Sequence, residues 1–428
     1  MIRIDECKDK ILSSEMEKRF LELYMDPSLL SYEKERYIRA IDRFRELYGE
    51  EQIVIFSAPG RTEVMGNHTD HQHGEVIAAS INRDAIAVVH PTGDNTIRIT
   101  SGDFPQIEVD LQDLSPCPGK ENGTKSIIKG VVRGFVDRGY RVGGFCAYAT
   151  SDVLIGAGLS SSASFETLIG TILSGLFNEA CVSSEEIAVI GQYAENVYFG
   201  KPCGLMDQMA CSVGGLIHVD FQNPEKAGVE RIDFDLCSVG YSLCITDTKS
   251  SHHDLTSEYA AIPREMKEIA GFFNREYLLG TSIQELIVHS SELRERFGDR
   301  AFLRAIHFVK ENDRVRCGVE ALKREDVGAF LEQVRLSGKS SAEVLQNVYV
   351  SSDVTHQNVS VALAVSDAVL DPKTSAHRVH GGGFAGTIQA FLRNEDVSSY
   401  KEVMDSVFGH DACQVLKIRL IGGTRVVG

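Results

Sequence analysis

The sequence of 428 residues has no tryptophan, and it contains no stretch of about 18 consecutive apolar residues. We therefore expect no membrane-spanning helix. The first twenty residues are charged and lack the apolar core of a signal peptide. Positive charge is also scarce, because 44 Lys and Arg stand against 61 Asp and Glu, for a net charge of −17. This balance argues against a nucleic-acid-binding surface, which requires a basic patch.

Cysteine pairs of the kind that bind zinc are missing as well. The ten cysteines are scattered, with no CxxC pair and no zinc-like spacing. They are typical of free thiols in a reducing compartment, so we expect a cytoplasmic protein. The remaining composition, 43% hydrophobic and 25% charged, is ordinary for a globular chain that can bury a large core in two domains. We expect a small-molecule partner, and a monomer or weak homo-oligomer.

Hydrophobic periodicity predicts a mixed α+β chain with three parts. A helical N-terminal extension, residues 1–40, has no role that the sequence assigns. A polar, proline-containing stretch near residues 221–229 divides the remainder into domains 41–222 and 223–428. Helices are predicted at 16–24, 32–48, 124–140, 183–199, 258–274, 301–322 and 327–336. Strands are predicted at 52–57, 75–80, 84–90, 96–100, 107–111, 144–150, 214–220, 241–246, 387–392 and 414–420.

The segment LIGAGLSSSASFE at residues 154–166 is rich in small residues and precedes a helical apolar pattern. We call residues 154–162 the glycine–serine loop. Glycine allows backbone N–H groups to approach a ligand, and serine side chains can cap the following helix. A helix N-terminus with such a loop is a natural anion site, and a plain tight turn with serine caps is the alternative on these residues alone.

Three motifs resemble those of the GHMP small-molecule kinases, and of galactokinases in particular. GAGLSSSAS resembles the ATP-phosphate loop, SAPGRTEVMGNHTDHQHGE (57–75) the galactokinase sugar signature, and HRVHGGGFAGTIQAFL (377–392) the third family motif. They occur in family order. The connecting stretches CGLMDQMACSVGG, DLTSEY and IHFVKENDRV also match, so the resemblance covers the chain from about residue 40 to its end.

The resemblance implies an ATP-dependent sugar 1-kinase of the galactokinase type. The implied fold has an S5-like N-terminal domain and a ferredoxin-like C-terminal domain, with the active site between them. The expected co-substrate is ATP, with Mg²⁺. The nucleotide contacts implied by the loop are Gly156, Ala157, Gly158, Leu159, Ser160, Ser161, Ser162 and Ala163.

Four of the matching residues carry the chemistry of phosphoryl transfer. Asp207 in CGLMDQ matches the family's general base, and Arg61 in APGR matches the active-site arginine. Glu195 and Ser162 match the magnesium ligands, whose hard oxygens suit that ion. The alternatives are a turn-capping aspartate, a surface ion pair and a solvated helix face.

The sugar-binding residues implied by the resemblance are Asn67, His68, Asp70, Gly204 and Tyr259. Galactokinases have a glutamate where this chain has Asn67. Because an amide can donate a hydrogen bond to a substrate carboxylate, a uronate such as galacturonate is an alternative substrate. The histidine-rich run NHTDHQH also allows a metal site as a separate hypothesis.

Two further features bear on function. The aromatic pair that flanks adenine in many galactokinases is replaced by Thr124 and Ile127, which leaves the nucleotide preference open. SGKSS at 337–341 is similar to a Walker A loop but has Gln333 in place of the required glycine. A non-catalytic, galactokinase-like sugar sensor is the remaining alternative, and the intact Arg61 and Asp207 disfavour it.

Overall fold

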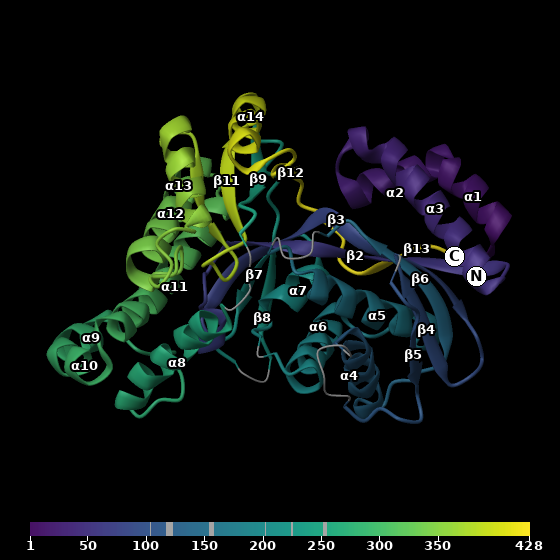
Figure 1. The fold of residues 1–428 in the computed structure, drawn as a ribbon, viewed down its shortest axis with the longest axis horizontal. Helices are drawn as coiled ribbons and strands as arrows, with labels where there is room; N and C mark the ends of the chain where they lie inside the picture. Colours follow the sequence, from purple (N-terminus) through teal and green to yellow (C-terminus); the bar gives the residue numbers. More distant parts are fainter. Residues whose placement is uncertain (103, 117–122, 154–157, 202, 224–225, 251–254) are drawn as a thin grey trace.

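The structure is a computed structural model that describes residues 1–428 except 103, 117–122, 154–157, 202, 224–225 and 251–254. In the described part, helices cover two β-sheets, one built mainly from each half of the chain (Figure 1). The mixed α+β prediction is confirmed. None of the described helices is long and apolar enough to cross a membrane.

The larger sheet has the strand order β1-β2-β3-β6-β4-β5, with β13 added to β2, and β7 and β8 added to β3. All its pairs are antiparallel except β4 with β6. The short β1 and β13 both pair with β2, so the two chain ends lie close together (Figure 1). The bounds are β1 (Ile2–Arg3), β2 (Gln52–Met65), β3 (Glu75–Pro91), β4 (Thr96–Ser101), β5 (Ile107–Asp110), β6 (Phe145–Ser151), β7 (Leu216–Asp220), β8 (Gly228–Ile232) and β13 (Thr424–Val427).

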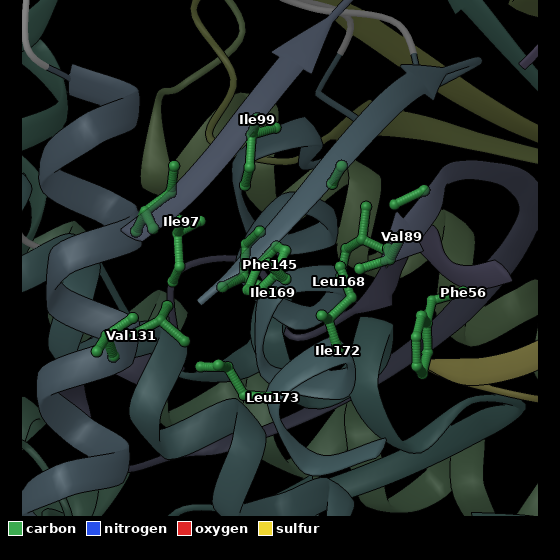
Figure 2. Packing of buried hydrophobic residues seen from close by; sticks show 14 of the residues in the cluster. Phe56, Val89, Ile97, Ile99, Val131, Phe145, Leu168, Ile169, Ile172 and Leu173 are labelled. Carbon is green, nitrogen blue, oxygen red and sulfur yellow. The ribbon is translucent and has the colours of Figure 1, made fainter. Parts of the chain in front are cut away.

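Helices cover both faces of this sheet because successive side chains of a strand point to opposite faces. Val54 and Phe56 of β2 pack into the core under α4 to α6. Figure 2 shows Phe56 in this core together with Leu168 and Ile172. Their neighbours Ile53 and Ile55 pack against α1 to α3, which we call the N-terminal helical layer. The bounds are α1 (Ile4–Leu12), α2 (Ser14–Tyr24), α3 (Leu30–Tyr48), α4 (Gly123–Asp137), α5 (Ser161–Phe177), α6 (Ser184–Tyr193) and α7 (Met206–Val213).

The second half of the chain forms a smaller antiparallel sheet in the order β10-β11-β9-β12. Its strands are β9 (Tyr241–Asp247), β10 (Ala376–His380), β11 (Thr387–Arg393) and β12 (Cys413–Leu416). Its helices are α8 (Thr256–Phe272), α9 (Ile283–Val288), α10 (Ser290–Phe297), α11 (Asp299–Lys323), α12 (Val327–Ser340), α13 (Asn358–Val369) and α14 (Val397–Phe408). One apolar cluster contains Met65 and Ile77 of the large sheet and Leu243 of the small one, so the two halves share a core.

Polar side chains of the small sheet bind the β2 backbone near its C-terminal end. Gln389 Nε2 donates to the carbonyls of Glu63 at 2.7 Å and Val64 at 3.1 Å, and Arg378 Nη1 donates to that of Val64 at 3.0 Å. His380 Nε2 accepts the Glu63 N–H at 3.2 Å. These bonds take the place of a neighbouring strand and hold the segment that carries Arg61.

The predicted elements are found, with corrections at several boundaries. The strand predicted at 52–57 does not end at Pro59-Gly60, because a register shift lets β2 continue to Met65. The two strands predicted at 75–80 and 84–90 form one strand, β3. The predicted 183–199 helix starts on its Ser183 cap but ends as a π-helical turn, Ala194–Phe199.

The division of the chain near residue 222 stays a prediction. Two strands that follow this position belong to the large sheet, since β8 pairs with β7 and β13 pairs with β2.

Candidate active site

Arg61 and Asp207 form a bidentate ion pair at the centre of the candidate site. Arg61 lies on β2, and Asp207 lies in the first turn of α7, where a negative charge is favourable. Arg61 Nε donates to Asp207 Oδ1 at 2.7 Å, and Nη2 donates to Oδ2 at 2.8 Å. The Arg61 side chain is 7% exposed and that of Asp207 is 31% exposed. Solvent and ligands therefore reach the carboxylate, while the guanidinium holds it from behind.

The described end of the glycine–serine loop lies against this pair. Arg61 Nη1 donates to the Gly158 carbonyl, and the Arg61 N–H donates to the Leu159 carbonyl at 3.1 Å. Ser160 Oγ donates to Asp207 Oδ2 at 2.5 Å. The sequence therefore correctly groups the loop with Arg61 and Asp207, although Gly156 and Ala157 lie outside the described residues.

Ser160 is not the helix cap that the sequence allows as one interpretation of the loop. It precedes α5 in a left-handed conformation, with φ of 56°, and its side chain caps no helical N–H group. The hydroxyl is turned to Asp207 instead, because the tertiary structure offers a carboxylate there. Ser161 begins α5, and Ala163 is buried within it.

The surroundings of Asp207 keep its carboxylate ionised. Burial by itself would raise the pKa of Asp207, but the Arg61 charge and the hydrogen bonds from Arg61 and Ser160 lower it below the ordinary value. Asp207 is consequently an acceptor of protons at neutral pH, which is the state that a general base needs.

Glu195 lies in a polar cluster beside α5. Ser162 Oγ donates to Glu195 Oε1 at 3.3 Å, and Lys201 Nζ donates to the same oxygen at 2.9 Å. Gln208 Nε2 donates to Glu195 Oε2 at 3.0 Å and to Glu166 Oε2 at 3.0 Å. The sequence predicts Ser162 and Glu195 as neighbours, and the structure places them so, but it does not predict Lys201, Gln208 or Glu166.

The residues of this cluster fit a magnesium ion. Glu195 and Ser162 offer hard oxygens, and the buried Glu166 Oε1 and Gln208 Oε1 have no hydrogen-bond partner. Lys201, whose side chain is 60% exposed, reaches the Glu195 carboxylate from the solvent side, so a cation at this carboxylate would replace its ammonium group. Burial and the Glu195 charge raise the pKa of Glu166 well above its ordinary value.

Three predicted sugar residues donate hydrogen bonds to successive carbonyls of the segment Gly381–Gly383, which we call the triglycine segment. Asn67 Nδ2 donates to the Gly381 carbonyl at 2.6 Å, His68 Nε2 to that of Gly382 at 2.9 Å, and Tyr259 Oη to that of Gly383 at 2.7 Å. The third sequence motif thus joins the sugar signature to Tyr259. Burial lowers the pKa of His68 to about 3, so His68 is neutral.

The side chain of Asn67 is fully buried and makes every hydrogen bond that an amide can make. Besides its bond to Gly381, Nδ2 donates to Glu63 Oε1 at 2.9 Å. Oδ1 accepts from Asn347 Nδ2 at 2.7 Å and from Ser341 Oγ at 3.2 Å. A sugar contact from Asn67 would therefore require one of these bonds to break.

Asp70 and Gly204 lie in direct contact. A Cβ atom on Gly204 would lie 1.7 Å from Asp70 Oδ2, so only glycine fits there without displacing the carboxylate. Asp70 begins the 3₁₀ turn Asp70–Gln72, and Gly204 precedes Asp207 in the same segment. This contact links the sugar signature to the segment that carries the base.

The metal-site hypothesis for the histidine run is not supported, because the described residues contain no group of three or more His, Cys, Asp or Glu that could hold a metal ion.

The sequence did not predict the side chains that anchor β2, which are those of Arg378, His380 and Gln389. The only signal for their segment was its resemblance to the third family motif. SGKSS lies at the end of α12, which confirms that it is not a phosphate loop. Ile127 is buried in α4.

Comparisons with known proteins point to one family. The family model of the galactokinase galactose-binding signature matches residues 42–91, and that of the GHMP kinase N-terminal domain matches residues 126–215. A galactokinase of Glaesserella parasuis is 30% identical over 359 residues, which is 83% of this chain and 89% of the relative. A galactokinase of Streptomyces coelicolor is 29% identical over 371 residues, covering 86% and 92%.

Solved structures show the same fold. The crystal structure of Lactococcus lactis galactokinase complexed with galactose matches with a TM-score of 0.77 and 24% identity, over 90% of this chain and 98% of that one. Methanococcus jannaschii mevalonate kinase matches with a TM-score of 0.59 and 14% identity, over 86% and 98%. The GHMP kinase fold expected from the sequence is confirmed, and the chain belongs to the galactokinase family.

Proposed function

We propose that this phosphotransferase moves the γ-phosphate of ATP to the anomeric hydroxyl of α-D-galactose, yielding galactose 1-phosphate and ADP. The observation that carries the proposal is the ionised, solvent-reachable Asp207, held by Arg61 and touched by Ser160 of the glycine–serine loop. Curated galactokinases that match most of the chain support the choice of sugar.

Asp207 acts as the general base in this proposal. Its carboxylate accepts the proton of the sugar hydroxyl, which makes the oxygen a better nucleophile toward the γ-phosphate. Arg61 holds the carboxylate in place and adds a positive charge beside the described loop residues Gly158 and Leu159, where phosphate charge develops.

Magnesium would be held by Glu195 and Ser162, with Gln208 fixing the orientation of the Glu195 carboxylate. When bound, the ion neutralises phosphate charge and orients the nucleotide. The loop backbone from Gly158 to Ser162, at the N-terminus of α5, is suited to phosphate oxygens.

His68, Asp70, Gly204 and Tyr259 are the proposed sugar-binding residues. Asn67 is left out of this set because its amide is engaged by protein groups on every side. The uronate alternative depended on a free Asn67 amide, so no structural observation favours it over galactose. The sensor alternative is disfavoured by the complete Arg61–Asp207–Ser160 arrangement.

A cytosolic monomer or weak homo-oligomer is also proposed. The nine cysteines that the structure describes are free thiols, which is typical of reducing compartments. Size-exclusion chromatography with light scattering measures the oligomeric state directly.

The test is a panel of sugars assayed for ATP-dependent 1-phosphate formation, with wild-type protein and Asp207→Asn. Galactose should be the preferred substrate among galactose, galacturonate, glucuronate, N-acetylgalactosamine, arabinose and mannose. In Asp207→Asn, kcat should fall by about 10²- to 10⁴-fold while galactose still binds in calorimetry, because the amide keeps the shape but cannot accept the proton.

The exposed Asp233→Asn serves as the matched control and should leave kcat unchanged. A near-normal kcat in Asp207→Asn would remove Asp207 as the base. A wild-type protein that is inactive on every sugar would contradict the proposed function.

A further inference from the structure

The N-terminal helical layer is attached to the large sheet by a buried arginine as well as by apolar contacts. Arg36 of α3 is 3% exposed and lies beneath the layer. Figure 1 shows this layer on the face of the sheet opposite α4 to α7. Burying a guanidinium is costly unless its charge and donors are matched, so its partners identify what it holds.

Arg36 binds two segments of the sheet that are far apart in the sequence. Nη1 donates to Asp84 Oδ1 at 2.7 Å, and Nη2 donates to the Asp84 carbonyl at 2.9 Å. Nη2 also donates to the Thr150 carbonyl at 3.4 Å, and Nη1 lies 3.4 Å from Asp152 Oδ2. Nη1 also donates to Glu33 Oε2 at 3.1 Å, whereas the buried Nε has no partner among the described residues.

Asp84 joins this arginine to the other parts of the large sheet. The carboxylate accepts hydrogen bonds from Tyr24 of α2 at 3.0 Å, from Ser57 of β2 at 2.5 Å and from Arg419 at 2.9 Å. Its backbone carbonyl accepts the Asp152 N–H at 2.9 Å. The N-terminal helical layer, strand β2 and the segment around Arg419 therefore meet at the fully buried carboxylate of Asp84.

Thr150 and Asp152 stand four and two residues before Leu154, the first residue of the glycine–serine loop. Thr150 lies near the end of β6, and Val153 follows Asp152 as a buried residue. A Cβ atom on Gly60 would lie 2.9 Å from Val153 Cγ1 and 2.8 Å from the Leu159 carbonyl, so the residue before the loop and a described residue within it both pack against the residue that precedes Arg61. A shift at Asp152 would consequently reach Leu159 through Val153 and Gly60.

We propose that Arg36 is a positioning residue for nucleotide binding. Through Arg36 the N-terminal helical layer holds residues 150–153, which lead directly into the glycine–serine loop. Arg36 acts on Thr150, Asp152 and Asp84 and touches none of the proposed sugar residues. This inference rests on the proposed function only in that the loop binds the phosphates of ATP. It assigns a role to a helical layer for which the sequence indicates none.

The test uses the full-length protein with Arg36→Met, which keeps an unbranched stem and removes the guanidinium donors, and Asp152→Asn, which removes the carboxylate charge that Arg36 faces. Arg39→Met is the matched control, because Arg39 lies on the same helix with a side chain that is 61% exposed. The readouts are Mg·ADP affinity by calorimetry, KM for ATP, KM for galactose and the melting temperature.

In Arg36→Met, Mg·ADP affinity should fall by about tenfold, with a matching rise in KM for ATP and an unchanged KM for galactose, because small misplacements of binding groups have large effects. Asp152→Asn should move the same two quantities in the same direction with a near-normal melting temperature. Arg39→Met should behave as wild type.

A merely structural role for Arg36 would lower the melting temperature and leave Mg·ADP affinity unchanged, and this outcome would overturn the proposal. If Arg36→Met does not fold, Asp152→Asn decides, and normal ADP affinity in that variant overturns the proposal as well. Failure of the proposed function is distinguishable, because wild-type protein would then bind no Mg·ADP or phosphorylate no sugar.

Discussion

Replacing Asn67 by aspartate tests whether this side chain serves the fold or the sugar. The change is isosteric and removes the two N–H donors while it keeps the two acceptor positions. The Gly381 carbonyl then loses a donor at 2.6 Å, and Glu63 Oε1, formerly 2.9 Å from an amide nitrogen, faces a second carboxylate. Asn347 and Ser341 still donate to the retained oxygen.

The magnitude follows from these contacts. A buried carbonyl without its donor costs about 1–3 kcal/mol, and an uncompensated buried charge costs about 3–5 kcal/mol. Because burial already raises the pKa of Glu63 against the effect of Arg378, the new pair will resist double ionisation and share a proton. Asn67→Asp should therefore be destabilised by about 4 kcal/mol or more near pH 8, and the loss should shrink toward pH 5 as the pair takes up that proton.

The assay is urea and thermal unfolding at pH 5 to 8, together with KM for galactose. Asn95→Asp, on an exposed loop, is the control and should unfold as wild type does. A variant of unchanged stability with an altered KM for galactose would refute the reasoning and would place the amide against the sugar. Asn67→Glu, which the sequence marks as a change of sugar specificity, should likewise act first on stability, because it adds bulk as well as charge to a closed site.

Two other substitutions test the metal cluster and the layer contact. Glu195→Gln should raise the magnesium concentration needed for half-maximal activity and lower kcat, with galactose affinity unchanged, and an unaltered magnesium titration would remove Glu195 from the site. Burial raises the pKa of Glu33 to about 7, although the charge of Arg36 acts to lower it. In the unfolded chain the pKa of this carboxyl is about 4.5, so the folded protein binds the proton more tightly. The resulting stabilisation of the folded state is complete below about pH 4.5 and is lost as the pH rises through about 7. Glu33→Gln should therefore gain about 2.5 kcal/mol of unfolding free energy relative to wild type between pH 5 and pH 8 in urea unfolding, and a constant difference across that range would contradict the assignment.

Local signals in the sequence were sufficient for most elements and for the residues that meet at the site. Helical periodicity and the Ser183 cap depend on residues within one or two turns, so they are visible before folding. The resemblance to galactokinases also assigned Arg61, Asp207 and the glycine–serine loop to one site, and the structure brings their described residues into contact. The length of β2 was underestimated because Pro59 and Gly60 usually end a strand, whereas a register shift accommodates them here.

The tertiary structure alone decided what several of these side chains do. Ser160 could cap a helix or bind phosphate, and only the position of Asp207 turns its hydroxyl to a carboxylate. Asn67 matches a sugar-binding position, yet Asn347 and Gly381, each about 280 residues or more away along the chain, take up its amide. Arg36 was one charge on an amphipathic helix until packing buried it against Asp84. Periodicity and motifs fix the local conformation and the type of each group, whereas the hydrogen-bond partners of a buried polar group depend on which distant segments the folded chain brings within about 3 Å of it.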